Sequence, residues 1–297
     1  MDTAEPTVTK QVASAGEGSV ALAWFRLLHP FPSFLVTIAS GVFAEMAAAG
    51  HAPADRLLRL VVSVICSQFA IGSANDVVDR HLDLVTKPWK PVARGIVSVS
   101  AATTLAVVLS LACLVLSTSI SLSTGLAAAV GLSCGLSYDL WFKRSRWSWL
   151  PYGLAIPTLP VWSWAAMGKL NAHLLPVYPL GLLLGLSLHL ANTLPDLEGD
   201  TTFGVQGLAH GWGRRRSLAV CWGSMALAQT LTLALAPVLH YHGVVYPIGL
   251  AVSGLLLLIS VLLYRLRPTA STLQVNFGVL ALASLALAAG WLGGAVA

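Results

Sequence analysis

Long apolar runs separated by short polar segments fill almost the whole chain. A bilayer core about 30 Å thick requires about 20 apolar residues per helix, and about nine runs reach that length. Their approximate limits are 22–48, 58–78, 98–118, 121–141, 148–167, 174–195, 216–239, 244–264 and 272–292. The pattern therefore predicts an all-α, polytopic membrane protein with about nine transmembrane helices. We expect a polar tail over residues 1–20 and a single transmembrane domain over residues 21–297.

Composition narrows the class of protein. Hydrophobic residues make up 56% of the 297 residues and charged residues only 10%, whereas soluble domains are about 25% charged. So few charges cannot cover a water-soluble fold, and the same figures exclude a disordered chain or a basic nucleic-acid-binding arm. The four cysteines lie inside apolar runs without the spacing of a disulfide framework or a zinc site. We therefore expect membrane lipids, and no nucleic acid, as partners.

Basic residues gather in alternate connections between the predicted spans. Twelve of the 17 Lys and Arg residues follow the second, fourth, sixth and eighth runs. They are Arg80, Lys87, Lys90, Arg94, Lys143, Arg144, Arg146, Arg214, Arg215, Arg216, Arg265 and Arg267. Because basic residues in short loops favour the cytoplasmic side, we expect a multi-pass protein of the cell membrane with a cytoplasmic N-terminus. Membrane topology alone is an alternative explanation for most of these charges.

The acidic residues form two clusters. Six of the 12 Asp and Glu residues lie in segments 75–83 and 196–200, and each segment closes an even-numbered apolar run. These matching positions suggest a duplicated unit within the chain. An Asp at the centre of a membrane helix costs about 2.5–3.5 kcal/mol, so acids at membrane depth normally line a cavity or pair with cations. We expect both clusters, and the mouth of the site, to face the cytoplasm.

Helical spacing gives the first cluster one oxygen-rich face. Asp76, Asp79 and Asp83 lie at positions i, i+3 and i+7, and Asn75 precedes Asp79 by four residues. Mg²⁺ takes oxygen ligands and is commonly shared between carboxylates and phosphates. This face is therefore suited to Mg²⁺.

The second cluster repeats part of this arrangement. Asp196 and Asp200 are again four residues apart, whereas Glu198 would point away on a regular helix. Two facing clusters could hold metal ions on either side of a diphosphate, with basic residues on the remaining phosphate oxygens. The basic candidates are Lys87, Lys90, Arg94, Lys143 and Arg144. The alternative is that the acids only balance neighbouring Lys and Arg at the interface.

At these residues the sequence resembles the UbiA superfamily of intramembrane prenyltransferases. The family pattern NDxxDxxxD matches residues 75–83, and the second pattern DxxxD matches residues 196–200. Segment 196–206 is similar to the second motif of members that act on homogentisate, chlorophyllide and related acceptors. Segment 87–95 departs from the Arg-Pro-x-x-Ser-Gly loop of many members, and segment 137–144 matches their Tyr-Ser-to-Lys-Arg stretch only loosely.

The resemblance implies nine helices around a central cavity that opens to the cytoplasm and laterally to lipid. It also implies Mg²⁺-dependent transfer of a prenyl group from a polyprenyl diphosphate to a lipophilic, usually aromatic acceptor. The implied metal ligands are Asp76, Asp79, Asp83, Asp196 and Asp200, and all of these except Asp83 are also taken as catalytic. The residues expected to contact substrate are Asn75, Lys143, Arg94, Arg26, Arg144, Tyr138 and Asn192.

The expected reaction is ionisation to an allylic cation, attack by an electron-rich carbon of the acceptor, and loss of a proton. Aromatic ring faces stabilise cations. The candidates are Tyr138, Trp141, Trp147, Trp149, Trp162 and Trp164, although an interfacial belt also explains such residues. His189 is a candidate proton acceptor or acceptor-binding group, and Asn192 could orient a carboxylate or substrate. A hydrogen bond between helices is the alternative for both.

Three other functions are compatible with the same residues. A terpene cyclase of this superfamily would use the metal cage without a second substrate. Transfer to a non-aromatic lipid or a sugar phosphate is another possibility. A divalent-cation transporter is a different class, but it requires acids near the midplane and an exit on the far side, where the predicted loops carry almost no acid. The acceptor, the prenyl length and the oligomeric state are not given by the sequence.

Overall fold

The computed structural model of the protein describes residues 20–197, 207–241 and 243–296. Within this part of the chain every regular element is a helix, and nine helices are long. Their bounds are α2 Pro30–Ala47, α3 Ala54–Val78, α5 Val99–Ile120, α6 Leu122–Leu140, α7 Leu150–Ala166, α8 Val177–Thr193, α10 Leu208–Val238, α11 Val245–Leu266 and α12 Ala270–Val296. The shorter elements are α1 Val20–Leu27, α4 Arg80–Thr86, and the 3-10 turns η1 Phe142–Arg144, η2 Ala172–Leu174 and η3 Leu194–Asp196.

Each predicted apolar run overlaps one long helix, so the all-α, polytopic prediction is confirmed. Among the described residues, seven helices are long and apolar enough to cross a membrane. The other two long helices are α6 and α7, which have 19 and 17 residues. The number of nine spans therefore stays a prediction.

The first predicted span, residues 22–48, is divided into α1 and α2. The break lies at His29, which has a left-handed backbone with φ of 48°. Pro30 begins α2, and a residue that precedes proline is disfavoured in the helical conformation. The break turns α1 away from the axis of α2 and leaves the His29 side chain at the end of the helix bundle.

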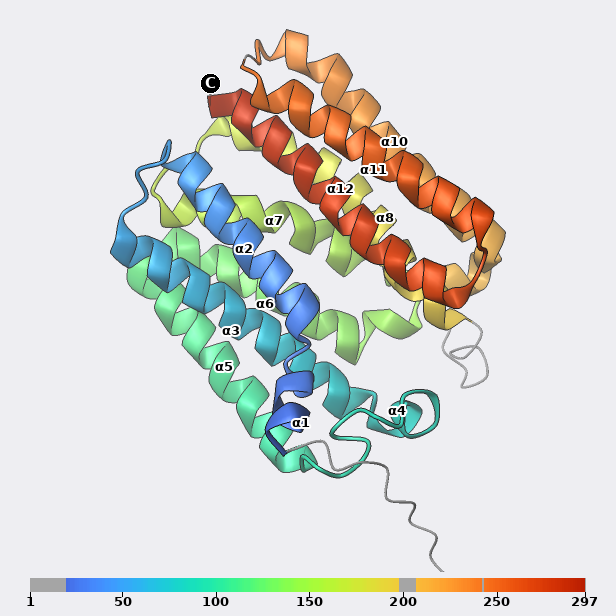
Figure 1. The fold of residues 1–297 in the computed structure, drawn as a ribbon. Coiled ribbons are helices and arrows are strands. Elements are labelled where there is room, and N and C mark those ends of the chain that lie inside the picture. Colours follow the sequence, from blue (N-terminus) through green and yellow to red (C-terminus); the bar gives the residue numbers. More distant parts are fainter. Residues whose placement is uncertain (1–19, 198–206, 242, 297) are drawn as a thin grey trace, which may run out of the picture.

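The long helices run antiparallel to their neighbours in the chain, so their ends fall into two sets (Figure 1). One end of the bundle carries α1, α4, η1 and η3, and the other carries the α2–α3 connection and the end of α12. The four connections with most of the basic residues lie at the first end, which we call the polar end. Arg214, Arg215 and Arg216 belong to α10 itself, just after a kink at Gly213.

Small residues allow close approach between the helices around the centre. A Cβ atom added to Gly185 of α8 would lie 2.6 Å from the Gly153 Cα of α7. Gly249 of α11 and Gly290 of α12 make an equally close contact. Small residues are the usual means by which membrane helices approach each other. These contacts fix the walls that surround the cavity described below.

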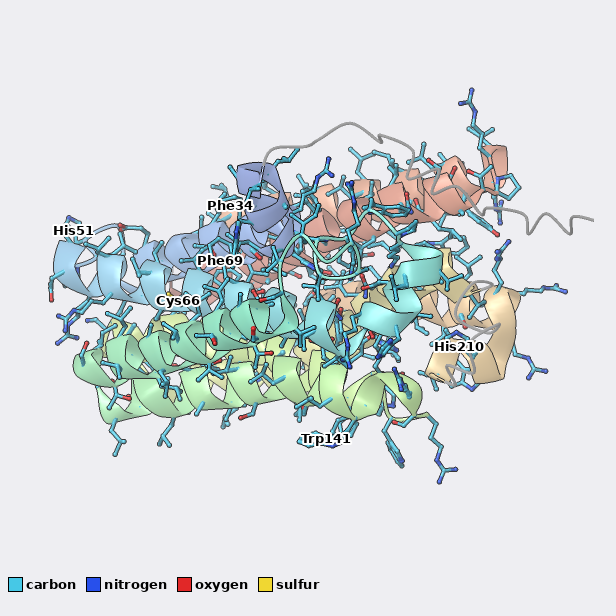
Figure 2. The ribbon with its side chains drawn as sticks, turned by 90° about the horizontal axis from the view of Figure 1, so that it is seen from below. Phe34, His51, Cys66, Phe69, Trp141 and His210 are labelled. Atoms are coloured by element: carbon cyan, nitrogen blue, oxygen red, sulfur yellow. The ribbon has the colours of Figure 1, made fainter. Side chains whose placement is uncertain are left out.

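Aromatic packing adds to this framework at the edge of the bundle. Phe34 of α2 meets Phe69 of α3 edge to face, with 6.2 Å between ring centroids (Figure 2). Two helices are mostly exposed: only 17% and 11% of the most apolar stretches of α5 and α11 are buried inside the bundle. These two helices therefore lie on the outer surface of the bundle.

Candidate active site

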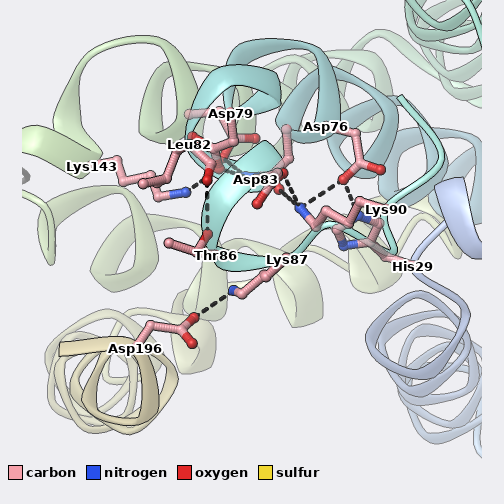
Figure 3. Close-up of polar contacts among 12 residues, drawn as sticks. His29, Asp76, Asp79, Leu82, Asp83, Thr86, Lys87, Lys90, Lys143 and Asp196 are labelled. Atoms are coloured by element: carbon pink, nitrogen blue, oxygen red, sulfur yellow. Dashed lines mark hydrogen bonds and ion pairs between the residues drawn. The ribbon is translucent and has the colours of Figure 1, made fainter. Parts of the chain in front are cut away.

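The first acidic cluster lies where α3 ends and α4 begins (Figure 3). Asp76 belongs to the last turn of α3, Asp79 links the two helices, and Asp83 belongs to α4. All three are buried, with 1%, 3% and 3% of their surface exposed. Burying ionised carboxylates is costly unless cations or hydrogen bonds compensate them, so the partners of these groups define the site.

Lys90 compensates two of the three carboxylates. Its Nζ atom lies 2.8 Å from Asp76 Oδ1 and 2.9 Å from Asp83 Oδ2, and it donates to Asn75 Oδ1 at 3.2 Å. Burial favours the neutral amine, but the Asp76 and Asp83 carboxylates outweigh this and raise the pKa of Lys90. Burial raises the pKa of Asp83, with Lys90 acting in the opposite direction. Lys90 thus remains a cation in the middle of the cluster.

A second lysine compensates Asp79. Lys143, which lies in η1, forms an ion pair with Asp79 Oδ2. Asn75 Nδ2 donates to the same oxygen at 3.1 Å and to Asp139 Oδ1 at 2.8 Å. Asp139, on α6, is a further buried carboxylate that the sequence patterns did not single out. Its only sequence signal is its position between Tyr138 and Lys143.

The second acidic cluster is joined to the first by an ion pair. Lys87 Nζ, just after α4, lies 2.6 Å from Asp196 Oδ2 of η3 (Figure 3). The two segments, 109 residues apart in sequence, are therefore adjacent at the polar end. Asp200 and Glu198, the other predicted members of this cluster, lie outside the described residues.

His29 is a site residue that the sequence analysis missed. Its Nε2 atom is 2.9 Å from Asp76 Oδ1, and the two residues are 47 positions apart in the chain. The contact exists because the break before Pro30 places this side chain against the end of α3. A His-Pro pair inside an apolar run was the available signal.

A cavity of about 510 Å³ extends from these residues into the bundle. At the polar end its lining includes Asn75, Asp79, Asp83, Lys87, Lys90, Asp139, Lys143, Asn192 and Asp196. The rest is mostly apolar and reaches Phe43, Val177 and Trp291 near the opposite end. Asp76 is not part of the lining, because it lies behind Lys90 and His29. The predicted central cavity is therefore present, with a charged end and an apolar body.

Three predicted phosphate-binding residues lie elsewhere. Arg26 and Arg94 are exposed and line a separate small depression together with Trp89. Arg144 is exposed and absent from the cavity lining, although its neighbour Lys143 is part of it. The physical reason for Arg26 is the break at His29, which places the end of α1 outside the bundle. The structure thus brings Lys90 and Lys143, but not these arginines, to the acidic cluster.

Among the aromatic candidates, only Tyr138 lines the cavity. Trp141 and Trp147 are exposed by 70% and 51%, and Figure 2 shows Trp141 at the outer edge. Trp149, Trp162 and Trp164 are partly or fully buried, yet they are also absent from the lining. Tyr152, which the sequence analysis missed, lines the cavity and meets Tyr138 edge to face at 5.2 Å between centroids.

His189 has a structural position and does not line the cavity. It is fully buried on α8, and its Nε2 atom is 2.9 Å from Ser148 Oγ. Ser148 Oγ in turn accepts a hydrogen bond from the Leu208 backbone N–H at 3.1 Å. In this structure His189 therefore links α8 to the segment before α7 and to the start of α10, and its role as proton acceptor stays a prediction. Asn192, one turn later on α8, does line the cavity.

The donor set at the polar end suits a hard divalent cation. Among the described residues no group of three His, Cys, Asp or Glu side chains is already arranged around one metal position. Lysines hold Asp76, Asp79 and Asp83. Within the described part of the chain, the buried Asp76 Oδ2 and Asp139 Oδ2 atoms have no hydrogen-bond partner. Buried carboxylate oxygens without partners are unusual and call for a ligand. Mg²⁺, which prefers such oxygens, fits this set if the lysines release them.

The sequence of this chain matches a known protein family and several of its members. A family model described as the UbiA prenyltransferase family matches residues 34–285. The bacteriochlorophyll synthase 33 kDa chain of Rhodobacter capsulatus is 29% identical over 174 residues, which is 55% of this chain and 57% of the relative. Chloroplastic chlorophyll synthase of Avena sativa is 27% identical over 233 residues, 72% of this chain and 61% of the relative. The chain thus spans less than two thirds of the length of these relatives.

Solved structures share the fold over almost their whole length. A structure of digeranylgeranylglyceryl phosphate synthase superimposes with a TM-score of 0.70 at 18% identity, covering 93% of this chain and 99% of that one. A UbiA homologue from Archaeoglobus fulgidus bound to GPP and Mg²⁺ gives a TM-score of 0.68 at 16% identity, covering 90% and 99%. At these identities the likeness establishes the fold.

Proposed function

Because the chain belongs to the UbiA prenyltransferase family, we propose that it transfers a prenyl group from a polyprenyl diphosphate to a lipophilic acceptor within the membrane. The observation that carries this proposal is the cavity, which joins a charged end of Lys, Asp and Asn side chains to a long apolar body. A prenyl diphosphate has the same division into a charged head and an apolar tail. The charged end of the cavity matches the diphosphate and its apolar body matches the prenyl tail, which supports this substrate class.

We infer that Mg²⁺ is the cofactor. The residues that would hold it are Asp79, Asp83 and Asp196, with Asp76 adjacent and Asp200 completing the second motif. When bound with the diphosphate, Mg²⁺ neutralises the charge of the leaving group as its C–O bond breaks. Support comes from the buried carboxylate oxygens and from the named complex of the Archaeoglobus fulgidus homologue with GPP and Mg²⁺.

Three lysines of this chain are placed to bind the diphosphate itself. Lys87, Lys90 and Lys143 line the charged end of the cavity. Their ammonium groups form ion pairs there with the carboxylates of Asp196, Asp83 and Asp79. Phosphate oxygens would replace those carboxylates as their partners, because cationic side chains bind both groups through charge-assisted hydrogen bonds. The exchange would free Asp79, Asp83 and Asp196 for the metal. One set of side chains therefore serves both resting and substrate-bound states.

Beyond the diphosphate, the cavity wall protects the reacting carbon. Tyr138 and Tyr152 both line the cavity, and aromatic rings of this kind stabilise an allylic cation. The apolar body excludes water, which would otherwise capture the cation. We infer that the acceptor is an aromatic lipophile, since the curated relatives are named for chlorophyll and bacteriochlorophyll synthesis.

The test is a transfer assay with the purified protein in lipid. Geranyl, farnesyl and geranylgeranyl diphosphates are each incubated with Mg²⁺ and with hydroxybenzoate, homogentisate, naphthoate, chlorophyllide or glycerol phosphate acceptors. We expect a prenylated product with an aromatic acceptor, and a loss of at least about a hundredfold in Asp79→Asn. Asp55→Asn, an exposed acid at the other end of α3, is the matched control and should retain activity. A cyclic hydrocarbon formed without any acceptor, or full activity in Asp79→Asn, would contradict the proposal.

A further inference from the structure

Two arginines form a basic site outside the cavity. Arg26, in the last turn of α1, and Arg94, in the turn before α5, line one shallow depression with Trp89, Leu22 and Ile96. They come from segments that are 68 positions apart, so the fold and not the local sequence brings them together. This depression is separate from the central cavity, with which it shares no lining residue.

Neither guanidinium group is paired with an acid of the described residues. Among the described acids at the polar end, Asp76, Asp79, Asp83 and Asp196 are paired with Lys90, Lys143 and Lys87. Asp139 accepts a hydrogen bond from Asn75. Within the described parts of the chain, Arg26 and Arg94 take part in no ion pair or side-chain hydrogen bond. Two like charges at one depression repel each other, and an anion between them would remove this cost. Guanidinium groups favour phosphate oxygens, which they bind through paired hydrogen bonds.

The surroundings of the pair indicate the interface between lipid and water. Trp89 is 59% exposed and Phe25, beside Arg26 on α1, is 49% exposed. Trp next to basic residues is typical of membrane interfaces, where the ring stays at headgroup level. Ile96 lies three residues before Val99, the first residue of α5, which is one of the least buried spans of the bundle. The depression therefore lies above a helix that faces lipid.

We propose that Arg26 and Arg94 bind the phosphate of an anionic membrane lipid, with Trp89 and Leu22 against its glycerol and upper acyl region. The charge of the pair fits the phosphate, and the exposed apolar side chains fit the lipid that carries it. This inference goes beyond the proposed function and does not depend on it, because it concerns a surface that the cavity does not reach. It also reassigns two arginines that sequence position alone had placed at the diphosphate.

Native mass spectrometry of the purified full-length protein tests the site without any prenyl substrate. Phosphatidylglycerol is titrated into the wild-type protein, into Arg26→Gln/Arg94→Gln, and into Arg265→Gln/Arg267→Gln. The last variant removes two exposed arginines from the same end of the bundle and is the matched control. We expect the affinity for the first bound phosphatidylglycerol to fall about thirtyfold in the first variant and to be unchanged in the control.

Two further arms make each outcome decisive. Arg26→Lys/Arg94→Lys keeps both charges and should retain more of the affinity than the Gln variant, and thermal unfolding of every variant should match the wild type. Glycerol 3-phosphate and inorganic phosphate should not displace the lipid at millimolar concentration. Equal lipid binding by the Gln variant and the control would overturn the proposal. Displacement by either soluble phosphate would replace the lipid with a free anion and would also overturn it.

Discussion

At the scale of single residues, Lys90 is the centre of the charged end. One ammonium group faces two buried carboxylates and the amide of Asn75. Removal of one partner from a buried ion pair costs about 3–5 kcal/mol, because the other charge stays buried without compensation. The same group is also proposed to bind the diphosphate. Stability and activity therefore depend on the same atom.

Lys90→Met should lower the free energy of unfolding by about 3 kcal/mol, since Asp76 and Asp83 lose their shared cation. Prenyl transfer should fall by at least about a hundredfold, the effect of removing one strong electrostatic contact to the leaving group. Thermal unfolding and transfer kinetics measure the two effects separately. Lys90→Arg keeps the charge and should recover most of the stability. Lys169→Gln, an exposed lysine at the opposite end, serves as control. An unchanged melting temperature in Lys90→Met would show that the pair is not stabilising.

His29 gives a smaller effect of a different kind. His29→Ala removes one hydrogen bond to Asp76, which is worth about 1 kcal/mol because the imidazole is partly exposed. We expect transfer to fall roughly five- to tenfold, and His29→Gln, whose amide can still donate, to recover part of it. His51→Ala, an exposed histidine at the opposite end, is the control. Equal activity of His29→Ala and wild type would mean that this contact does not position Asp76.

Sequence reasoning found the residues of the site that are linked by helical spacing and missed those linked only by the fold. The spacing of Asp76, Asp79 and Asp83 correctly predicts that they lie together, although they belong to two helices, α3 and α4, that meet at Asp79, and not to one helix face. His29 and Asp139 reach the cluster from other helices, and no spacing rule connects them to it. Arg94 is the opposite case, because it is near the motif in sequence but lines a separate depression and not the cavity. Local patterns predict which groups lie together within a segment and cannot predict what lies across from it.

At the scale of the elements, proline and glycine decide where the apolar pattern and the helices differ. Hydropathy alone predicts one span over residues 22–48, whereas Pro30 divides it and His29 becomes part of the site. Gly213, with φ of 73°, kinks α10 before its basic residues in a similar way. Glycines also set how closely helices approach, because a Cβ at Gly185 has no space against Gly153.

Gly185→Ala should therefore destabilise the protein by about 1–3 kcal/mol, the usual cost of overpacking. The added methyl group would force α7 and α8 apart, and both helices line the cavity. Gly223→Ala on α10 makes the same chemical change where a Cβ meets nothing within 4 Å. It should be neutral or slightly stabilising, since alanine favours helix. Thermal unfolding of both variants in detergent is the measurement. A Gly185→Ala protein as stable as Gly223→Ala would refute the close approach.

At the scale of the whole molecule, alternation of direction brings the charged ends together. Successive long helices run in opposite directions, so every second helix ends at the polar end (Figure 1). Because α3 and α8 both end there, the acidic segments that follow them share one end of the bundle. The apolar runs predicted this arrangement before any contact was known. They could not predict the depth of the cavity, which depends on the side chains that face inward.

That depth should determine which prenyl chain is accepted. Cavity-lining residues on α8 extend from Val177 to Thr193, about 24 Å of helix. Phe43 and Trp291 line the part of the cavity near Val177, far from the acidic cluster. A long prenyl tail must end at these rings, so a smaller side chain there should admit a longer tail. The prediction concerns Phe43, whose ring is 3% exposed on α2.

Phe43→Ala should raise the ratio of kcat/KM for geranylgeranyl over geranyl diphosphate by about tenfold, because the added space accommodates apolar atoms of the longer tail. Both substrates are assayed on the same preparation, so any loss of folded protein cancels from the ratio. Phe69→Ala on α3 is the control, since this ring packs on Phe34 and is absent from the cavity lining. An unchanged ratio in Phe43→Ala would mean that the prenyl tail leaves the cavity laterally before it reaches Phe43. A change in both variants would point to a general loosening of the bundle, which thermal unfolding would then reveal.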